Sequence, residues 1–204
     1  MPKVYELEGV KPVIHPTAFV HPDAILIGDV VIGANCYVGP CASLRGDFGP
    51  IRVSEGANIQ DHCMLHSFPG VGCHVKENGH IGHGAILHGC MVKANSFIGM
   101  NSVIMDGAII GSQAMVAAMA FVKAAFEVPP KALVAGTPAK VIKIMDDEQI
   151  KWMGNGAREY QHLTRRCNAE LKSCEPLTKL EENRPRLKIS KTTSKSPHET
   201  KKES

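Results

Sequence analysis

Residues 14–44 read IHPTAFVHPDAILIGDVVIGANCYVGPCASL, and a large aliphatic side chain recurs in this stretch at every sixth position. Small side chains follow most of these positions by four residues, as at Ala18, Ala24 and Ala42. An α-helix requires a period of about 3.6 residues and a half-buried hairpin strand requires strict alternation, so the stretch fits neither. A period of six with one large and one small inward residue predicts a short strand followed by a tight corner.

The same spacing continues through most of the chain, which predicts a repetitive fold. With two interruptions and one dropped residue, the aliphatic positions are Ile14, Val20, Leu26, Ile32, Val38, Leu44, Val53, Ile59, Leu65, Val75, Ile81, Leu87, Val92, Ile98, Ile104, Ile110, Val116 and Val122. Three such units close one triangular coil of about 18 residues, and stacked coils bury a continuous core. The pattern therefore predicts an all-β parallel β-helix of about six coils over residues 10–125.

Composition and charge exclude several classes of protein. Aromatic residues make up only 5% of the 204 residues, which suits a core of small and β-branched side chains. Residues 184–204 carry a net charge of +5 and the rest of the chain carries −2. The net positive charge of the whole chain therefore comes from this segment and is poor evidence for nucleic-acid binding. No apolar run is long enough for a transmembrane helix, the first ten residues do not resemble a signal peptide, and the seven cysteines form no CxxC pair. We expect a cytoplasmic protein with free thiols and no membrane partner.

The C-terminal third of the chain departs from the repeat. Residues 126–145 contain three prolines and are expected to form a loop followed by an extended segment. Residues 146–175 predict a C-terminal helix, because Asp146 fits an N-cap, Gln149 follows three residues later, and apolar residues recur at helical spacing. We expect this helix to pack on the β-helix or on a neighbouring subunit. Residues 184–204 have little to bury and are expected to be a disordered basic tail.

Six of the ten histidines lie between residues 62 and 88, and the register of the coil brings two of them together. His66 and His88 each follow an inward leucine and are separated by one full coil. They are therefore expected on the same outer face, about 4.8 Å apart along the stack. Two imidazoles at that spacing can bind one metal ion. The alternative is that both are polar corner residues without a ligand.

A third histidine, His83, follows an inward isoleucine by two residues and belongs to the preceding face of the coil. Within one subunit it is expected to point away from His66 and His88. It could complete a metal site only across an interface, and a ring of three subunits supplies such a contact. The remaining histidines of the region are assigned to corners and loops: His62, His74 and His80.

Polar residues accompany the histidines in two motifs, RGD and NIQD. The register places Arg45 one coil before His66 and places Gln60 on the adjacent face. Asp47 and Asp61 complete the two clusters. An Arg–Asp pair on a surface is most often a structural ion pair, whereas beside a metal it can orient a bound water or a carbonyl oxygen. The residues alone leave both interpretations open.

Four stretches together resemble the gamma-class carbonic anhydrase-like branch of the hexapeptide-repeat proteins. They are SLRGDFGPIRV, GANIQDHCMLH, GHIGHGAILHGC and GMNSVIMDGA, within a similarity that spans residues 10–140. The resemblance implies a left-handed β-helix and a homotrimer with a metal site between subunits. It implies that His66 and His88 of one subunit and His83 of the next bind a divalent metal, Zn²⁺ or else Fe²⁺ or Co²⁺. Near the metal it implies catalytic roles for Arg45, Asp47 and Gln60, with Asp61 supporting the interface.

The full-length pattern is similar to two subgroups of that family, one from phenylacetate degradation and one from carnitine operons. The first subgroup implies a metal-dependent thioesterase that hydrolyses acyl-CoA with a metal-bound hydroxide, and this hydrolase is our main prediction. Phe48 stands where strongly active anhydrases carry a glutamate directly after the aspartate that matches Asp47, which argues against fast CO₂ hydration. The alternatives are gamma-type carbonic anhydrase activity, CoA-dependent acyl transfer with a histidine base and no metal, and a purely structural subunit.

Overall fold

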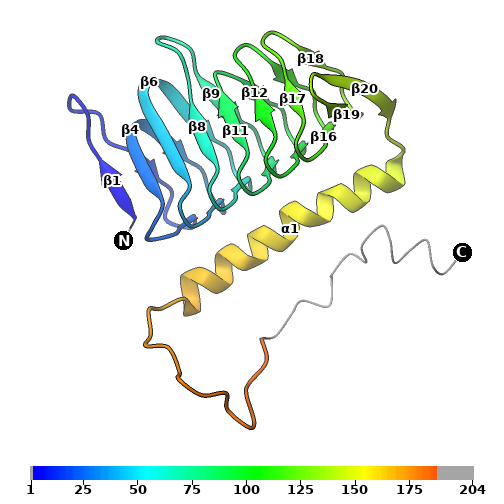
Figure 1. The fold of residues 1–204 in the computed structure, drawn as a ribbon. Coiled ribbons are helices and arrows are strands. Elements are labelled where there is room, and N and C mark those ends of the chain that lie inside the picture. The colour runs from blue at the N-terminus through cyan, green and yellow to red at the C-terminus, as the bar shows by residue number, and fades with distance from the viewer. Residues whose placement is uncertain (1, 188–204) are drawn as a thin grey trace, which may run out of the picture.

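The computed structural model describes residues 2–187 and shows a parallel β-helix with one long helix along its side (Figure 1). The strands are β1 (Lys3–Tyr5), β2 (Val13–Ile14), β3 (Phe19–Val20), β4 (Ile25–Ile32), β5 (Tyr37–Val38), β6 (Ser43–Val53), β7 (Asn58–Ile59), β8 (Met64–His66), β9 (Cys73–Val75), β10 (His80–Ile81), β11 (Ile86–His88), β12 (Met91–Val92), β13 (Phe97–Ile98), β14 (Val103–Ile104), β15 (Ile109–Ile110), β16 (Met115–Val116), β17 (Phe121–Val122), β18 (Glu127–Val128), β19 (Ala132–Gly136) and β20 (Ala139–Ile144). The helix is α1 (Asp147–Glu170).

The strands form two sheets that wrap around a triangular prism. One face is an 8-stranded sheet in which β3, β5, β7, β10, β13, β16 and β19 stack in parallel and β20 closes the end in antiparallel pairing. A 12-stranded sheet covers the other two faces, because the long strand β6 pairs with β8 through its start and with β9 through its end. Each strand thus lies beside the strand one coil away, as the repeat predicted.

The stack has about seven coils rather than the six expected, because it continues beyond residue 125. β18 pairs in parallel with β15, and β19 pairs in parallel with β16, in the segment where the sequence predicted a loop and an extended segment. Val128 and Val134 are buried and keep the spacing of six after Val122. The two prolines that follow Val128 favour a loop when the sequence is considered alone, yet they fit at a corner between strands.

The core is the column of aliphatic residues that the period of six identifies. Every one of these positions from Val20 to Val122 is buried, and Ile14 in the first coil is partly buried. The small residues four positions later are buried beside them, as at Ala42, Ala85 and Ala108. Stacked small and large layers leave no room for aromatic rings inside the prism, and the predicted core is confirmed.

Helix α1 covers the face made by the 8-stranded sheet (Figure 1). Asp146 caps it by accepting a hydrogen bond from the Gln149 backbone N–H at 2.8 Å, and the Gln149 side chain completes a capping box. Tyr160 of the helix packs on Tyr37 of β5, with ring centroids 5.1 Å apart. The helix therefore lies against its own β-helix, one of the two placements that the sequence left open.

The chain after α1 has no regular structure up to residue 187. The helix ends at Glu170, five residues before the end of the segment in which it was predicted. Most of the predicted tail at 184–204 lies outside the described residues. Among residues 2–187, no helix is both long enough and apolar enough to cross a membrane.

Candidate functional site

Strands β8 and β11 bring His66 and His88 together, as the register predicted. The two residues are direct partners in adjacent parallel strands, and their ring centroids lie 5.3 Å apart at an interplanar angle of 63°. Leu65 and Leu87 precede them and are fully buried, which anchors both strands in the core. The predicted adjacency of the two imidazoles is confirmed.

Arg45 and Asp47 surround His66 at the start of the long strand β6. His66 Nε2 lies 2.9 Å from Asp47 Oδ1 and 3.1 Å from Arg45 Nη2, and Arg45 Nη1 lies 3.4 Å from Asp47 Oδ2. A carboxylate can only accept a hydrogen bond, so the Asp47 contact requires a proton on His66 Nε2. The guanidinium, which can only donate, then stabilises Asp47 rather than His66. The RGD motif therefore orients the His66 ring through its carboxylate.

His88 has its own carboxylate, Asp106, whose Oδ1 lies 2.6 Å from His88 Nδ1. This contact places the proton on Nδ1 and leaves the lone pair on Nε2. Two aromatic rings border the imidazoles: Phe48 lies 5.3 Å from His66, and Phe68 meets His88 edge-on at 5.2 Å. Sequence reasoning missed Asp106, although the spacing places it in the corner one coil after Gly89.

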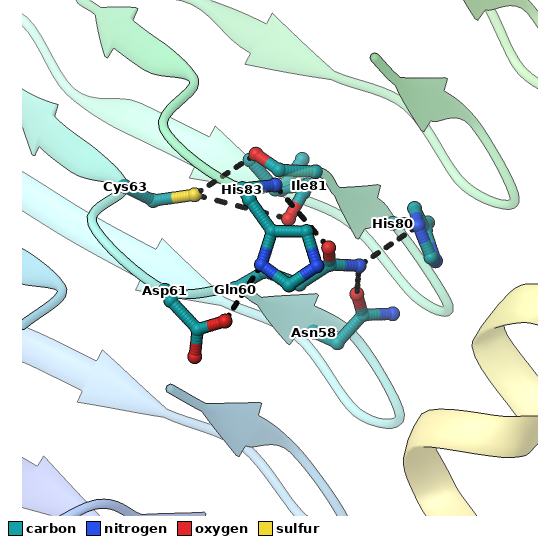
Figure 2. Close-up of polar contacts among 8 residues, drawn as sticks. Asn58, Gln60, Asp61, Cys63, His80, Ile81 and His83 are labelled. Atoms are coloured by element: carbon teal, nitrogen blue, oxygen red, sulfur yellow. Dashed lines mark hydrogen bonds and ion pairs between the residues drawn. The ribbon is translucent and has the colours of Figure 1, made fainter. Parts of the chain in front are cut away.

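His83 lies in the turn between β10 and β11, on a different edge of the prism from the His66 and His88 pair. Its Nδ1 lies 2.7 Å from Asp61 Oδ2, so Asp61 holds the proton on Nδ1 and leaves Nε2 as a base (Figure 2). The side chain is 45% exposed, compared with 25% for His88 and 11% for His66. Among these three carboxylate-bound histidines, His83 is the most exposed to solvent in one chain.

Gln60, predicted to be a catalytic residue near the metal, is only 2% exposed. Its Oε1 accepts a hydrogen bond from the His83 backbone N–H at 3.2 Å, and its Nε2 donates to Asn58 Oδ1 at 3.0 Å (Figure 2). Gln60 thus supports the turn that carries His83 from within the fold, and it does not face solvent in one chain.

His80, assigned from the sequence to a corner or loop, is buried under α1. Its ring stacks on Phe97 with centroids 4.2 Å apart at 10°, and its Nε2 lies 2.8 Å from Gln60 Nε2. Burial, together with the nearby charge of His83, lowers the pKa of His80 to about 4, so the ring is neutral at pH 7. The repeat shows that His80 points out of the prism, but only the position of α1 shows that this face is covered.

Within one chain, the predicted metal ligands do not come together as a set of three. Among residues 2–187, no group of three or more His, Cys, Asp or Glu side chains is placed to hold a metal ion. His88 fits a zinc ligand, because a carboxylate on Nδ1 and a free Nε2 are common at such sites. His66 could bind a metal through Nε2 only if this atom loses its hydrogen bond to Asp47. One chain therefore brings together only two of the three predicted ligands, and His83 could join them only from another copy.

Comparison with known proteins identifies a matching family and closely similar relatives. Residues 11–46 match the family described as bacterial transferase hexapeptide (six repeats). Over 183 residues the chain is 54% identical to the carnitine operon protein CaiE of Escherichia coli K12, a match that covers 90% of this chain and 93% of the relative. The CaiE protein of a Proteus strain is also 54% identical, over 185 residues.

Two solved structures of related proteins have the same fold as this chain. A hexapeptide transferase family protein of Anaplasma phagocytophilum superposes with a TM-score of 0.77 at 36% identity, covering 80% of this chain and 96% of that one. A Bacillus cereus protein assigned as an acetyltransferase gives 0.79 at 33% identity, with 80% and 95% covered. The predicted fold class, a left-handed β-helix of hexapeptide repeats with a C-terminal helix, is confirmed.

These relatives correct the main functional prediction. The matching family is described as a transferase family, and the two solved relatives are described as transferases. The prediction of a metal-dependent hydrolase is therefore wrong, and the findings favour the alternative of CoA-dependent acyl transfer. The two curated relatives described above are both carnitine operon proteins, which is one of the two subgroups that the sequence resembles.

Proposed function

The chain belongs to the hexapeptide-repeat family, among relatives of the carnitine operon protein CaiE, and we propose that it transfers an acyl group from coenzyme A to an acceptor hydroxyl or amine. The observation that carries this proposal is the His83–Asp61 pair. Its imidazole has a fixed tautomer, a free Nε2 and an exposed position. Such a group can take a proton from an acceptor, which is the one catalytic element that acyl transfer without a metal requires.

The proposed reaction is a direct attack of the acceptor on the thioester. His83 Nε2 takes the proton from the acceptor O–H or N–H while the acceptor atom bonds to the thioester carbonyl carbon. The carbonyl oxygen carries the negative charge in the tetrahedral intermediate. When the carbonyl reforms, the C–S bond breaks, and the CoA sulfur receives the proton from the imidazolium. Asp61 stabilises that imidazolium through Nδ1–H and remains ionised throughout.

Acceptor dependence of CoA release tests this proposal. We expect free CoA thiol to appear from acetyl-CoA when L-carnitine, which carries a hydroxyl, is the acceptor. γ-Butyrobetaine, which is L-carnitine without that hydroxyl, is the matched control and should give only background release. A panel of amines and alcohols extends the assay if carnitine is not the acceptor. Thiol release at the same rate with every acceptor and with none contradicts acyl transfer.

We propose separately that His66 and His88 provide two of the three histidine ligands of a divalent metal site, with His83 of a second copy in a homotrimer as the third. The support is the 5.3 Å distance between the two ring centroids together with the carboxylates Asp47 and Asp106, which can orient the rings. A metal there would supply a positive charge close to a bound carbonyl. It would also occupy His83 Nε2, so one imidazole cannot be base and ligand at once.

Metal analysis of the purified protein decides between these two roles of His83. The metal proposal predicts about one divalent ion per subunit and its loss in His88→Ala. His62→Asn is the control, since His62 is exposed and asparagine tolerates its positive φ of 58°. Wild-type protein without metal after growth with zinc, or full metal content in His88→Ala, contradicts the metal site and leaves His83 free to act as a base.

A further inference from the structure

A chain of hydrogen bonds connects the region under α1 to the proposed base. The His80 ring is 9% exposed and is packed between Phe97 of β13, on which it stacks, and Tyr160 of α1, which meets it edge-on at 5.5 Å. Its Nε2 contacts the Gln60 amide, and the other end of that amide receives the N–H of His83. Figure 2 shows Gln60 extended between these two histidines.

The contacts of Gln60 fix the direction of its amide. Oε1 must accept, because its partner is the backbone N–H of His83. Nε2 therefore carries the two hydrogens, one for Asn58 Oδ1 and one for His80 Nε2. His80 Nε2 is the acceptor and its proton is on Nδ1. If this acceptor is lost, one Gln60 hydrogen stays buried without a partner, and the amide loses the contact that holds it toward His83.

Helix α1 determines where the His80 ring lies. A Cβ on Gly156 would come within 3.1 Å of both Nδ1 and Cε1 of His80, which is closer than ordinary contact. The ring has little room to retreat, because it is stacked on Phe97. By contrast, a Cβ on Gly154, two residues earlier in the helix, would meet only Arg158 Nη1 at 3.6 Å.

We propose that His80 is a positioning residue for His83 and that α1 controls it through Gly156. His80 does not touch the reacting atoms. It holds Gln60, Gln60 holds the backbone of the turn, and the turn presents the His83 imidazole to the acceptor. The expected effect of His80 on the rate of acyl transfer rests on the proposed function. The expected effect of His80 on the position of the His83 turn does not depend on that function.

Three variants of the full-length protein test this proposal. His80→Phe keeps a ring beside Phe97 and removes the acceptor for Gln60. Gly156→Ala presses on His80, and Gly154→Ala is its matched control, because both changes add the same methyl group and the same helix propensity to α1. Thermal unfolding checks that each variant is folded. If His80→Phe does not fold, Gly156→Ala still tests the proposal.

The primary readout is hydrogen exchange of the His83 backbone amide. We expect exchange about tenfold faster in His80→Phe and in Gly156→Ala, and unchanged in Gly154→Ala. The Gly84 amide of the same turn donates to the Asp61 backbone carbonyl at 2.9 Å and should keep its protection in every variant. In the transfer assay, kcat should fall about tenfold in the first two variants, while KM for acyl-CoA stays close to wild type.

Unchanged protection of the His83 amide in both His80→Phe and Gly156→Ala overturns the proposal. Equal loss of protection at Gly84 also overturns it, because the turn as a whole would then be loosened. If the wild-type protein transfers no acyl group, the proposed function fails, and the amide exchange still decides whether His80 positions the turn.

Discussion

His83→Asn is expected to slow acyl transfer about 100- to 10,000-fold and to leave KM for acyl-CoA close to its wild-type value. The asparagine side chain is polar and fits the space, but it has no nitrogen that can take a proton at neutral pH. Asp61, at 2.7 Å from the imidazole in the wild type, then has no imidazolium to stabilise. The measurement is the steady-state rate of CoA thiol release with the acceptor that the wild-type enzyme uses.

His62→Asn is the matched control for this variant. His62 is exposed and has a positive φ of 58°, a conformation that asparagine tolerates well. The same substitution is thereby made close to Asp61 without removing the proposed base. We expect His62→Asn to transfer at the wild-type rate. If His83→Asn retains more than about one tenth of the wild-type kcat, His83 is not the base.

Ile81→Ala is expected to lower the free energy of unfolding by about 2–5 kcal/mol. Ile81 is fully buried between Ile59 and Ile98, its partners in the coils on either side. Truncation leaves a cavity in a column of close-packed side chains, and the neighbouring coils cannot collapse into it without shifting their own hydrogen bonds. Chemical denaturation followed by circular dichroism measures the change.

The control for this variant is Ile142→Ala in β20, where the isoleucine is 58% exposed. The same truncation at a solvated position should cost less than about 0.5 kcal/mol. Similar destabilisation by the two substitutions would mean that the column of aliphatic residues does not carry the stability of the β-helix.

The six-residue spacing of the aliphatic residues correctly predicted contacts between neighbouring coils. One inward residue per six fixes which residues share a face, and this rule correctly places His66 beside His88 and Arg45 beside His66. The same rule failed to extend the stack to Val128 and Val134, because the adjacent prolines favour a loop when they are considered locally.

Contacts that leave the stack could not be predicted from the repeat. Asp106 reaches His88 from the following corner, where side-chain direction depends on the turn rather than on the strand register. His80 occupies an outward position that the repeat treats as solvated, and it is buried because α1 lies on that face. The period of six contains no information on where a separate helix packs.

The reaction itself was predicted incorrectly for a chemical reason. A histidine with a carboxylate on Nδ1 and a free Nε2 serves equally as a zinc ligand and as a general base. The motifs around His83 and His88 therefore fit both a metal-dependent hydrolase and a transferase. The relatives described as transferases, and not the motif, separate the two activities.

Isotope tracing in ¹⁸O-labelled water tests acyl transfer most directly. The wild-type protein is incubated with acetyl-CoA and its acceptor, and the products are analysed by mass spectrometry. Acyl transfer predicts an acylated acceptor without ¹⁸O, since no water enters the reaction. Free acid that carries ¹⁸O as the main enzyme-dependent product would show attack by water and would contradict the account.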